Sequence, residues 1–422
     1  MYEKIVLPSG LRLFLVPFDQ TLSVSILIYV GTGSRYEEAK LSGISHFVEH
    51  MVFKGTKKRP TSKVISQTID NIGGELNAGT GKDYTVYIAK VATEHWEKGS
   101  TLIADILQNS LFDPAEITKE SGVIIEEINM YLDTPLRHVL QLFEELIWGS
   151  ETPLGRDIAG TEQTITKFKQ KDFITYIKEH YTIDNIIIGV GGNFDKKTVI
   201  DDINKLFNKL PKNKKQEAQK NTTTQTKPQL VVHRKKTEQT HFCLGFRTFP
   251  NSNPDKYVLL VLETILGGNM SSRLFTKIRE DLGLAYMIGT SITQYQDVGT
   301  ITVHAGLQTS NTEKALTIIL KELHTLKKTK VSTPELQGAK DYLKGKLALS
   351  LDDPEGVTSW VCRQELLLGK IQPIEKINQE IEKVTANDIL RISKNIFLPE
   401  KLNLAVISPT HTKKSLEKLL IV

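Results

Sequence analysis

Two histidines and one glutamate are spaced so that they could hold and use a metal ion. His46 and His50 are four residues apart, and Glu49 lies three residues after His46. On a helix, this spacing puts both imidazoles on one face, one turn apart. Two such imidazoles can bind a tetrahedral Zn²⁺, and Glu49 can serve as a general base toward a water molecule. An H-x-x-E-H match arises by chance in about one such chain in a hundred, so the pattern favours a zinc site over two hydrogen-bonded core histidines.

The flanking residues predict the helix that positions this pattern. Ser42 can cap its start and Gly55 can end it. The remaining positions are apolar, as expected for a helix against a core: Ile44, Phe47, Val48, Met51 and Val52. The other eight histidines, including His95, His138 and His304, show no ligand spacing.

A third ligand is expected from the helix that begins at Asp113-Pro114-Ala115-Glu116, a strong start signal. Glu120 and Glu127 are seven residues apart, two turns, and share a face with apolar neighbours. Buried carboxylates must be paired or bind metal. Glu126 is about 100° away around the helix, and we expect it to be solvated. The spacing therefore favours Glu127 over Glu126 as the ligand.

The chain repeats one unit. A strand-like segment at 84–88 precedes a helix at 94–111, and a segment at 300–304 precedes a helix at 312–326. Further helices and Asp-x-Pro turns follow in the same order in both halves, so duplication is the simplest explanation. Other strands are expected at 3–7, 11–16, 23–30, 185–191, 229–233, 240–246 and 402–407. Strands and helices mix without regular β-α-β alternation, which predicts an α+β class with mostly antiparallel sheets packed against helices.

A polar stretch divides the halves. Residues 213–228 contain one Ala and no other apolar residue, so they are interpreted as a linker. The predicted organisation is a zinc-binding domain at 1–212 and a second homologous domain at 229–422. The positions that match the metal pattern in the second half are Leu259, Leu262, Glu263 and Lys346. This set cannot bind zinc, so one zinc per chain is expected.

Composition indicates an ordinary globular protein. The 422 residues are 39% hydrophobic and 24% charged, with a mild net charge of +5. No apolar run is long enough to span a membrane, and nothing predicts a nucleic-acid surface. Cys243 and Cys362 lie in apolar stretches and are expected to be free buried thiols. The start of the chain lacks a signal-peptide pattern, so a cytoplasmic location is expected.

The sequence resembles the pitrilysin and insulysin family of inverzincins, in the mitochondrial-processing-peptidase-like bacterial branch. The resemblance covers essentially the whole chain. It is carried by the segments 43–56, 73–78, 123–128, 267–274 and 279–286.

The resemblance implies roles for particular residues. Glu127, 77 positions after His50, would be the third zinc ligand, and Glu120 would support the site. Asn77 and Ala78 match an edge strand to which a peptide substrate adds as a further strand. In the second half, Arg279 would hold substrate and the Tyr286 hydroxyl would stabilise the oxyanion.

The expected function is a zinc metalloendopeptidase that cuts unfolded peptides in an enclosed chamber. A homodimer is expected, with each active site shared between chains, since this chain carries both the zinc pattern and the Arg279/Tyr286 pair. The alternatives are the catalytic subunit of a heterodimeric processing peptidase and a non-hydrolysing peptide-binding subunit. A purely peptide-binding protein would not need Glu49.

Overall fold

The computed structural model describes residues 2–213 and 216–420. The chain forms two compact units. Unit 1 comprises Met1–Ile128, Asp157–Gln219 and Leu349–Ile371, and unit 2 comprises Asn129–Arg156, Lys220–Ala348 and Gln372–Val422. Each unit is described by itself.

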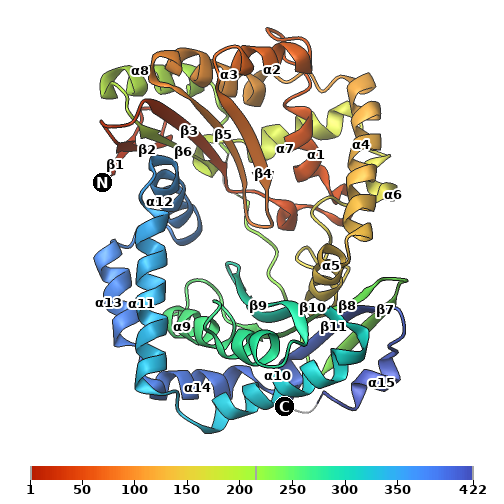
Figure 1. Cartoon of the computed structure of the whole chain (residues 1–422). Helices are drawn as coiled ribbons and strands as arrows, with labels where there is room; N and C mark the ends of the chain where they lie inside the picture. Colours follow the sequence, from red (N-terminus) through yellow and green to blue (C-terminus); the bar gives the residue numbers. More distant parts are fainter. Residues whose placement is uncertain (1, 214–215, 421–422) are drawn as a thin grey trace. The chain divides into compact units, whose positions relative to one another are not determined.

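Unit 1 is built on a six-stranded sheet (Figure 1). Its strands are β1 (Glu3–Val6), β2 (Arg12–Pro17), β3 (Ser23–Val30), β4 (Glu75–Thr80), β5 (Thr85–Ala92) and β6 (Ile186–Gly192). The spatial order is β1-β2-β6-β3-β5-β4, in which only β2 and β6 are parallel neighbours. Consequently β4 forms one edge of the sheet.

Unit 1 has helices on both faces of this sheet and beside it. They are η1 (Ser34–Tyr36), η2 (Ala39–Leu41), α1 (Ile44–Met51), α2 (Ser62–Asp70), η3 (Thr93–His95), α3 (Trp96–Asn109), α4 (Pro114–Asp133), α6 (Glu162–Ile165), α7 (Gln170–His180), η4 (Ile183–Asn185), α8 (Lys196–Phe207) and α12 (Pro354–Leu368). Side chains alternate along a strand, so Leu13 and Leu15 join the core that contains α1 and α3, while Phe14 and Val16 pack with α12. In Figure 1, α2, α3 and α8 lie above the sheet and α12 lies below it.

Unit 2 is built on a five-stranded sheet. Its strands are β7 (Gln229–Arg234), β8 (Gln239–Thr248), β9 (Ala285–Gln294), β10 (Gly299–Gln308) and β11 (Leu402–Ser408). The order is β7-β11-β8-β10-β9, and β7 and β11 are the parallel pair. Its helices are α5 (Pro135–Trp148), α9 (Lys256–Leu266), the π-helix η5 (Phe275–Glu280), η6 (Thr309–Asn311), α10 (Thr312–Lys328), α11 (Thr333–Ser350), α13 (Ile374–Lys383), α14 (Ala386–Ile396), η7 (Pro399–Lys401) and α15 (Lys413–Glu417).

The two sheets share one topology. When β1 is set aside, β2-β6-β3-β5-β4 of unit 1 corresponds strand by strand to β7-β11-β8-β10-β9 of unit 2, including the parallel pair. The predicted α+β class and internal duplication are therefore confirmed.

The compact units do not coincide with the two halves of the sequence, because each unit contains one helix from the other half. α5 packs in unit 2, where Val139, Phe143 and Ile147 contact the cluster that contains Cys243 and Ala405. α12, from the second half, packs in unit 1 in the same way. The units thus differ from the sequential division at 1–212 and 229–422. A sequential division cannot show this exchange, because it depends on which sheet buries each apolar helix face.

The predicted linker at 213–228 has no helix or strand among its described residues; Lys214 and Lys215 lie outside the described part. Its second half is held to unit 2, since Arg247 donates to the Thr223 carbonyl oxygen at 2.6 Å and the Gln225 amide donates to the Leu402 carbonyl oxygen at 2.9 Å.

Cys243 and Cys362 are free and buried, as expected, and burial raises the pKa of both thiols. Among the described residues, no helix is both long enough and apolar enough to cross a membrane.

Candidate metal centre

The metal-binding pattern lies on α1, whose start differs from the sequence prediction. The cap residue is Gly43, in the left-handed region at φ 96°. Ser42 does not cap the helix. Instead, the buried Glu37 carboxylate accepts hydrogen bonds from the Gly43 and Ser45 backbone N–H groups, each at 2.8 Å. A carboxylate from an upstream turn thus satisfies the exposed donors of this helix.

The end of α1 also differs from the sequence prediction. The helix ends at Met51 rather than near Gly55. Gly55 has φ 154°, and an added Cβ would lie 2.6 Å from the Pro60 carbonyl oxygen. Gly55 therefore permits a close turn after the helix, and this turn brings Lys54 toward α4.

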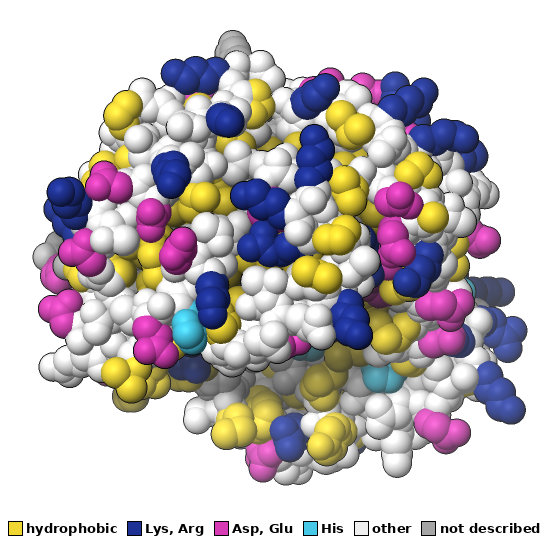
Figure 2. All heavy atoms as spheres, turned by 90° about the horizontal axis from the view of Figure 1, so that it is seen from above, with side chains coloured by type: hydrophobic (Ala, Val, Ile, Leu, Met, Phe, Trp, Pro, Cys, Tyr) yellow, Lys and Arg dark blue, Asp and Glu magenta, His cyan; other side chains and the backbone are white. Residues whose placement is uncertain are grey.

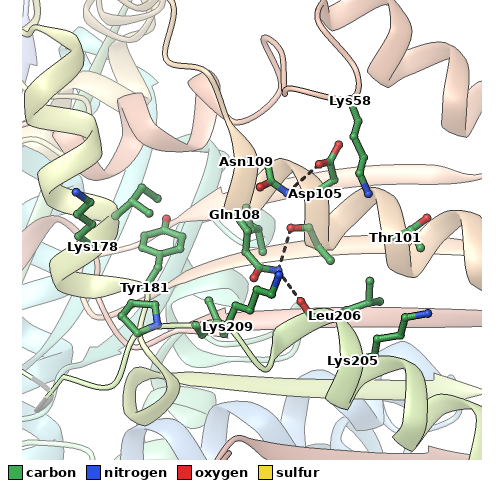
Figure 3. A pocket seen from close by; sticks show the side chains of 15 residues that line it. Lys58, Thr101, Asp105, Gln108, Asn109, Lys178, Tyr181, Lys205, Leu206 and Lys209 are labelled. Atoms are coloured by element: carbon green, nitrogen blue, oxygen red, sulfur yellow. Dashed lines mark hydrogen bonds between the residues drawn. The ribbon is translucent and has the colours of Figure 1, made fainter.

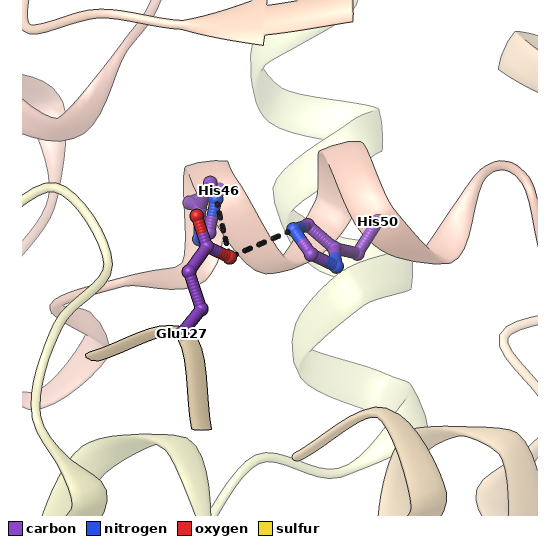
Figure 4. A group of neighbouring side chains, drawn as sticks. All are labelled: His46, His50 and Glu127. Carbon is purple, nitrogen blue, oxygen red and sulfur yellow. Dashed lines mark ion pairs between the residues drawn. The ribbon is translucent and has the colours of Figure 1, made fainter. Parts of the chain in front are cut away.

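The structure brings His46, His50 and Glu127 together (Figure 4). The Glu127 Oε2 atom lies 3.7 Å from His46 Nε2 and 3.5 Å from His50 Nε2. Two ligand atoms on one tetrahedral zinc are about 3.3 Å apart, given bonds of about 2.0–2.2 Å. Two imidazole nitrogens and one carboxylate oxygen at these distances fit a zinc ion. Glu126, at the preceding position of α4, is exposed and outside this group.

Glu120 orients His50 by contacting Nδ1, the ring nitrogen that faces away from the metal position. Its side chain is 3% exposed, and its Oε1 accepts a hydrogen bond from His50 Nδ1 at 2.9 Å. Because Nδ1 is engaged by Glu120, Nε2 is the ring nitrogen that faces the metal position, and it would bind a metal once its proton is released. The Lys54 ammonium lies 2.6 Å from the other oxygen, Oε2. Sequence reasoning did not identify Lys54, although it lies within the segment that carries the family resemblance.

The surroundings shift the pKa values of His46 and His50 in opposite directions. Burial lowers the pKa of His46 to about 4, and the neighbouring His50 acts in the same direction. Burial also lowers the pKa of His50, but the hydrogen bonds to Glu120 and Glu127 outweigh it and raise the pKa to about 9. For Glu120, burial raises the pKa, but hydrogen bonds from His50 and Lys54 outweigh it, so the net pKa is lowered. His46 is thus neutral and ready to act as a ligand, and Glu120 stays ionised.

Glu49 lies beside this group and is tied to the edge strand. The Thr80 hydroxyl, at the end of β4, donates a hydrogen bond to Glu49 Oε2. Burial raises the pKa of Glu49, and the Thr80 hydrogen bond opposes this only in part. A raised pKa suits a general base that must later release its proton near neutral pH. Thr80 was also missed from the sequence, since a lone threonine carries no pattern.

Asn77 and Ala78 lie on β4, the edge strand whose Thr80 contacts Glu49. The Asn77 side chain is exposed, and its Oδ1 accepts a hydrogen bond from the Ala78 backbone N–H at 2.8 Å. Both residues pair with β5, Asn77 opposite Ile88 and Ala78 opposite Tyr87.

Arg279 and Tyr286 belong to unit 2 and lie together there. The Arg279 guanidinium is 5.6 Å from the centre of the Tyr286 ring and 4.8 Å from that of Phe275. Tyr286, on β9, is 80% exposed. These two side chains therefore form an accessible cation–aromatic pair.

No second metal-binding group appears in the described part of the chain; His46, His50 and Glu127 form the one set of three close ligands found there. Glu263, which matches His50 in the repeat, instead accepts a hydrogen bond from the Thr290 hydroxyl at 2.8 Å.

A duplicated α+β chain with an H-x-x-E-H helix and a third carboxylate from a later helix defines the inverzincin class of metallopeptidases. The chain belongs to the M16 peptidase family. Residues 14–162 match the family model described as Insulinase (Peptidase family M16), and residues 167–343 match the one described as Peptidase M16 inactive domain.

Relatives of similar length support this assignment. The chain is 36% identical to a protein named an uncharacterized zinc protease from Bacillus subtilis, over 97% of this chain and 99% of that one. It is 35% identical to one of the same description from Rickettsia felis, over 93% and 94%. Among solved structures, a protease from Helicobacter pylori has the same fold, with a TM-score of 0.89, 22% identity, and 97% and 99% of the two chains covered. Family membership supports a peptidase role.

Proposed function

We propose that this protein is a zinc metalloendopeptidase that hydrolyses unfolded peptides. The observation that carries the proposal is the convergence of His46, His50 and Glu127, with Glu49 beside them and Glu120 behind His50. The set fits one zinc per chain. A zinc ion held there would polarise the substrate carbonyl and make water more acidic.

The side chains of this chain supply the proton transfers and the orientation. Glu49 accepts a proton from the attacking water and later gives it to the leaving amine. Thr80 holds one carboxylate oxygen of Glu49, and the other oxygen would accept the proton of the water. Glu120 and Lys54 keep His50 in one tautomer and one orientation.

The substrate class follows from the edge position of β4. An extended peptide that pairs with β4 beside Asn77 and Ala78 would be held through its backbone, largely without regard to side-chain identity. Only an unfolded segment offers such a backbone. We propose that such segments reach the site in an enclosed chamber, which excludes folded proteins.

We further propose a cytoplasmic homodimer in which Arg279 and Tyr286 of one copy complete the site of the other. The exposure of Tyr286 and its pairing with Arg279 support this, because both remain accessible to a substrate. The alternative is a heterodimer with a separate partner chain, in which this chain is the catalytic subunit.

Metal removal and return tests the proposed function. Purified protein should contain about one zinc, lose cleavage of an unstructured peptide mixture after chelation, and regain it with added zinc. Full activity of metal-free protein would overturn the proposal. Peptide binding with no cleavage by the zinc-loaded protein would instead identify a peptide-binding subunit.

A further inference from the structure

A pocket of about 570 Å³ lies in unit 1, away from the metal-binding group (Figure 3). It is formed by α3, the end of α7, the end of α8 and the segment that follows α1. None of His46, Glu49, His50, Glu120 and Glu127 lines it. Its volume falls in the range of about 300–1,000 Å³ that small-molecule sites occupy.

Four lysines from three separate segments line this pocket: Lys58, Lys178, Lys205 and Lys209. Within the described part of the chain, none of the four has a carboxylate at ion-pair distance. All four side chains are exposed. A concave surface lined by unpaired charges of one sign concentrates counter-ions of the opposite sign.

The one acidic residue in the lining is already engaged. Asp105 Oδ2 accepts hydrogen bonds from the Thr56 hydroxyl at 2.7 Å and from Arg59 Nη1 at 2.6 Å. Its Oδ1 accepts one from the Asn109 amide at 3.0 Å. Its charge is therefore offset by Arg59, and it does not neutralise the lysines.

The rest of the lining is largely apolar and well fixed. Gln108 donates hydrogen bonds to the Ala104 carbonyl oxygen and, across the pocket, to the Leu206 carbonyl oxygen, at 3.2 and 3.0 Å. This joins α3 to α8 (Figure 3). Apolar surface comes from Leu107, Ile177, Tyr181, Leu206 and Leu210.

The wider surface agrees with this charge distribution. Figure 2 views the molecule from above, the side on which α2, α3 and α8 lie in Figure 1. On this face, Lys and Arg side chains are spread over the whole surface, including its middle, and most Asp and Glu side chains lie toward its two sides.

We propose that this pocket binds a small organic phosphate: an anionic phosphate group near the lysines and an apolar part on the pocket floor, the apolar surface formed by Leu107, Ile177 and Leu206. Lysine is a common phosphate ligand because its ammonium is a compact charge with three donors. The apolar floor gives the site a preference for an organic phosphate over a bare phosphate ion. The proposal does not depend on the peptidase function.

Three matched probes test it by titration calorimetry on the whole protein without divalent cations: ADP, pyrophosphate and adenosine. ADP should bind most tightly, pyrophosphate more weakly, and adenosine at least ~10-fold more weakly than ADP, because it lacks the charges that the lysines recognise. If pyrophosphate bound as tightly as ADP, the apolar floor would not contribute to binding, and the preference for an organic phosphate would be wrong. Adenosine binding as tightly as ADP, or no ADP binding at millimolar concentration, would overturn the phosphate site.

A pair of charge variants locates the binding. Lys205→Gln with Lys209→Gln should weaken ADP binding at least ~10-fold. Lys328→Gln with Lys330→Gln removes the same charge from exposed positions outside the pocket and should leave ADP binding within about twofold of the parent. Equal weakening in both variants would mean that ADP responds to net charge alone, and the site would be refuted. Unchanged thermal unfolding of the variants without ligand shows that the fold is intact.

Discussion

At the residue scale, the most informative comparison is between two adjacent glutamates, Glu126 and Glu127. Glu126 and Glu127 differ by one step around α4, yet Glu127 reaches both histidines and Glu126 is exposed. Helical spacing from Glu120 predicted this facing, because residues seven apart share a face. It did not predict Lys54 and Thr80, because their contacts come from a turn and from a strand that are distant in sequence from their partners.

The facing argument predicts unequal effects of two matched substitutions. Glu127→Gln should lower zinc affinity by at least ~10-fold, measured by competition with a chelator, because a carboxylate ligand is lost. Glu126→Gln removes the same charge from an exposed position and should behave nearly as the parent. The reverse order would show that Glu126 is the ligand.

A second prediction concerns Lys54, whose ammonium contacts the buried Glu120. Lys54→Met should weaken zinc binding by about 10-fold, because Glu120 loses the cation that holds it against His50. Lys54→Arg should recover much of this affinity, since it restores the charge.

Lys57→Met provides the control for Lys54, because Lys57 lies in the same turn but is exposed. If both Met variants bind zinc equally, Lys54 does not position Glu120.

At the element scale, the sequence predicted strands well where apolar residues alternate or run continuously. β3 was predicted at 23–30, and it spans Ser23–Val30. β9 was not predicted, because half of Ala285–Gln294 is Gly, Ser, Thr or Gln and its apolar residues do not alternate regularly. It is a strand through pairing with β10. The exchange of α5 and α12 was also beyond sequence reasoning, since helical periodicity shows an apolar face but not the sheet that covers it.

The packing of α5 can be tested with two positions on that helix. Ile147 is fully buried, so Ile147→Ala should reduce the free energy of unfolding by ~2–4 kcal/mol, measured by urea denaturation. Leu140 is 38% exposed, and Leu140→Ala should reduce the free energy of unfolding by less than about 1 kcal/mol. Similar losses at both positions would contradict the packing of α5 on the unit 2 sheet.

At the scale of the whole molecule, duplication was visible from sequence because the order of strand, helix and Asp-x-Pro turn repeats. The sheets confirm it, down to the single parallel pair in each. One copy carries the candidate metal ligands, and the other carries Arg279 and Tyr286. The assembly that would join these sets involves a second chain, so a single sequence cannot establish it.

Subunit exchange tests the proposed shared site. Glu49→Gln and Arg279→Ala are each expected to be inactive. Random exchange gives about half mixed dimers, each with one intact site, so activity should return to roughly a quarter of the parent level. Each variant exchanged with itself is the control and should stay inactive. An inactive mixture after proven exchange would place the site within one chain or exclude Arg279 from it.

The central claim, that the α1–α4 group is a catalytic zinc centre, is tested most directly by zinc content and peptide cleavage measured together for the parent and Glu49→Gln. The substitution keeps the size of the side chain and leaves His46, His50 and Glu127 in place. The variant should retain about one zinc per chain and bind peptide, while cleavage falls by at least ~10²-fold, because the proton acceptor is lost. A zinc-loaded Glu49→Gln variant that cleaves at the parent rate would contradict the account.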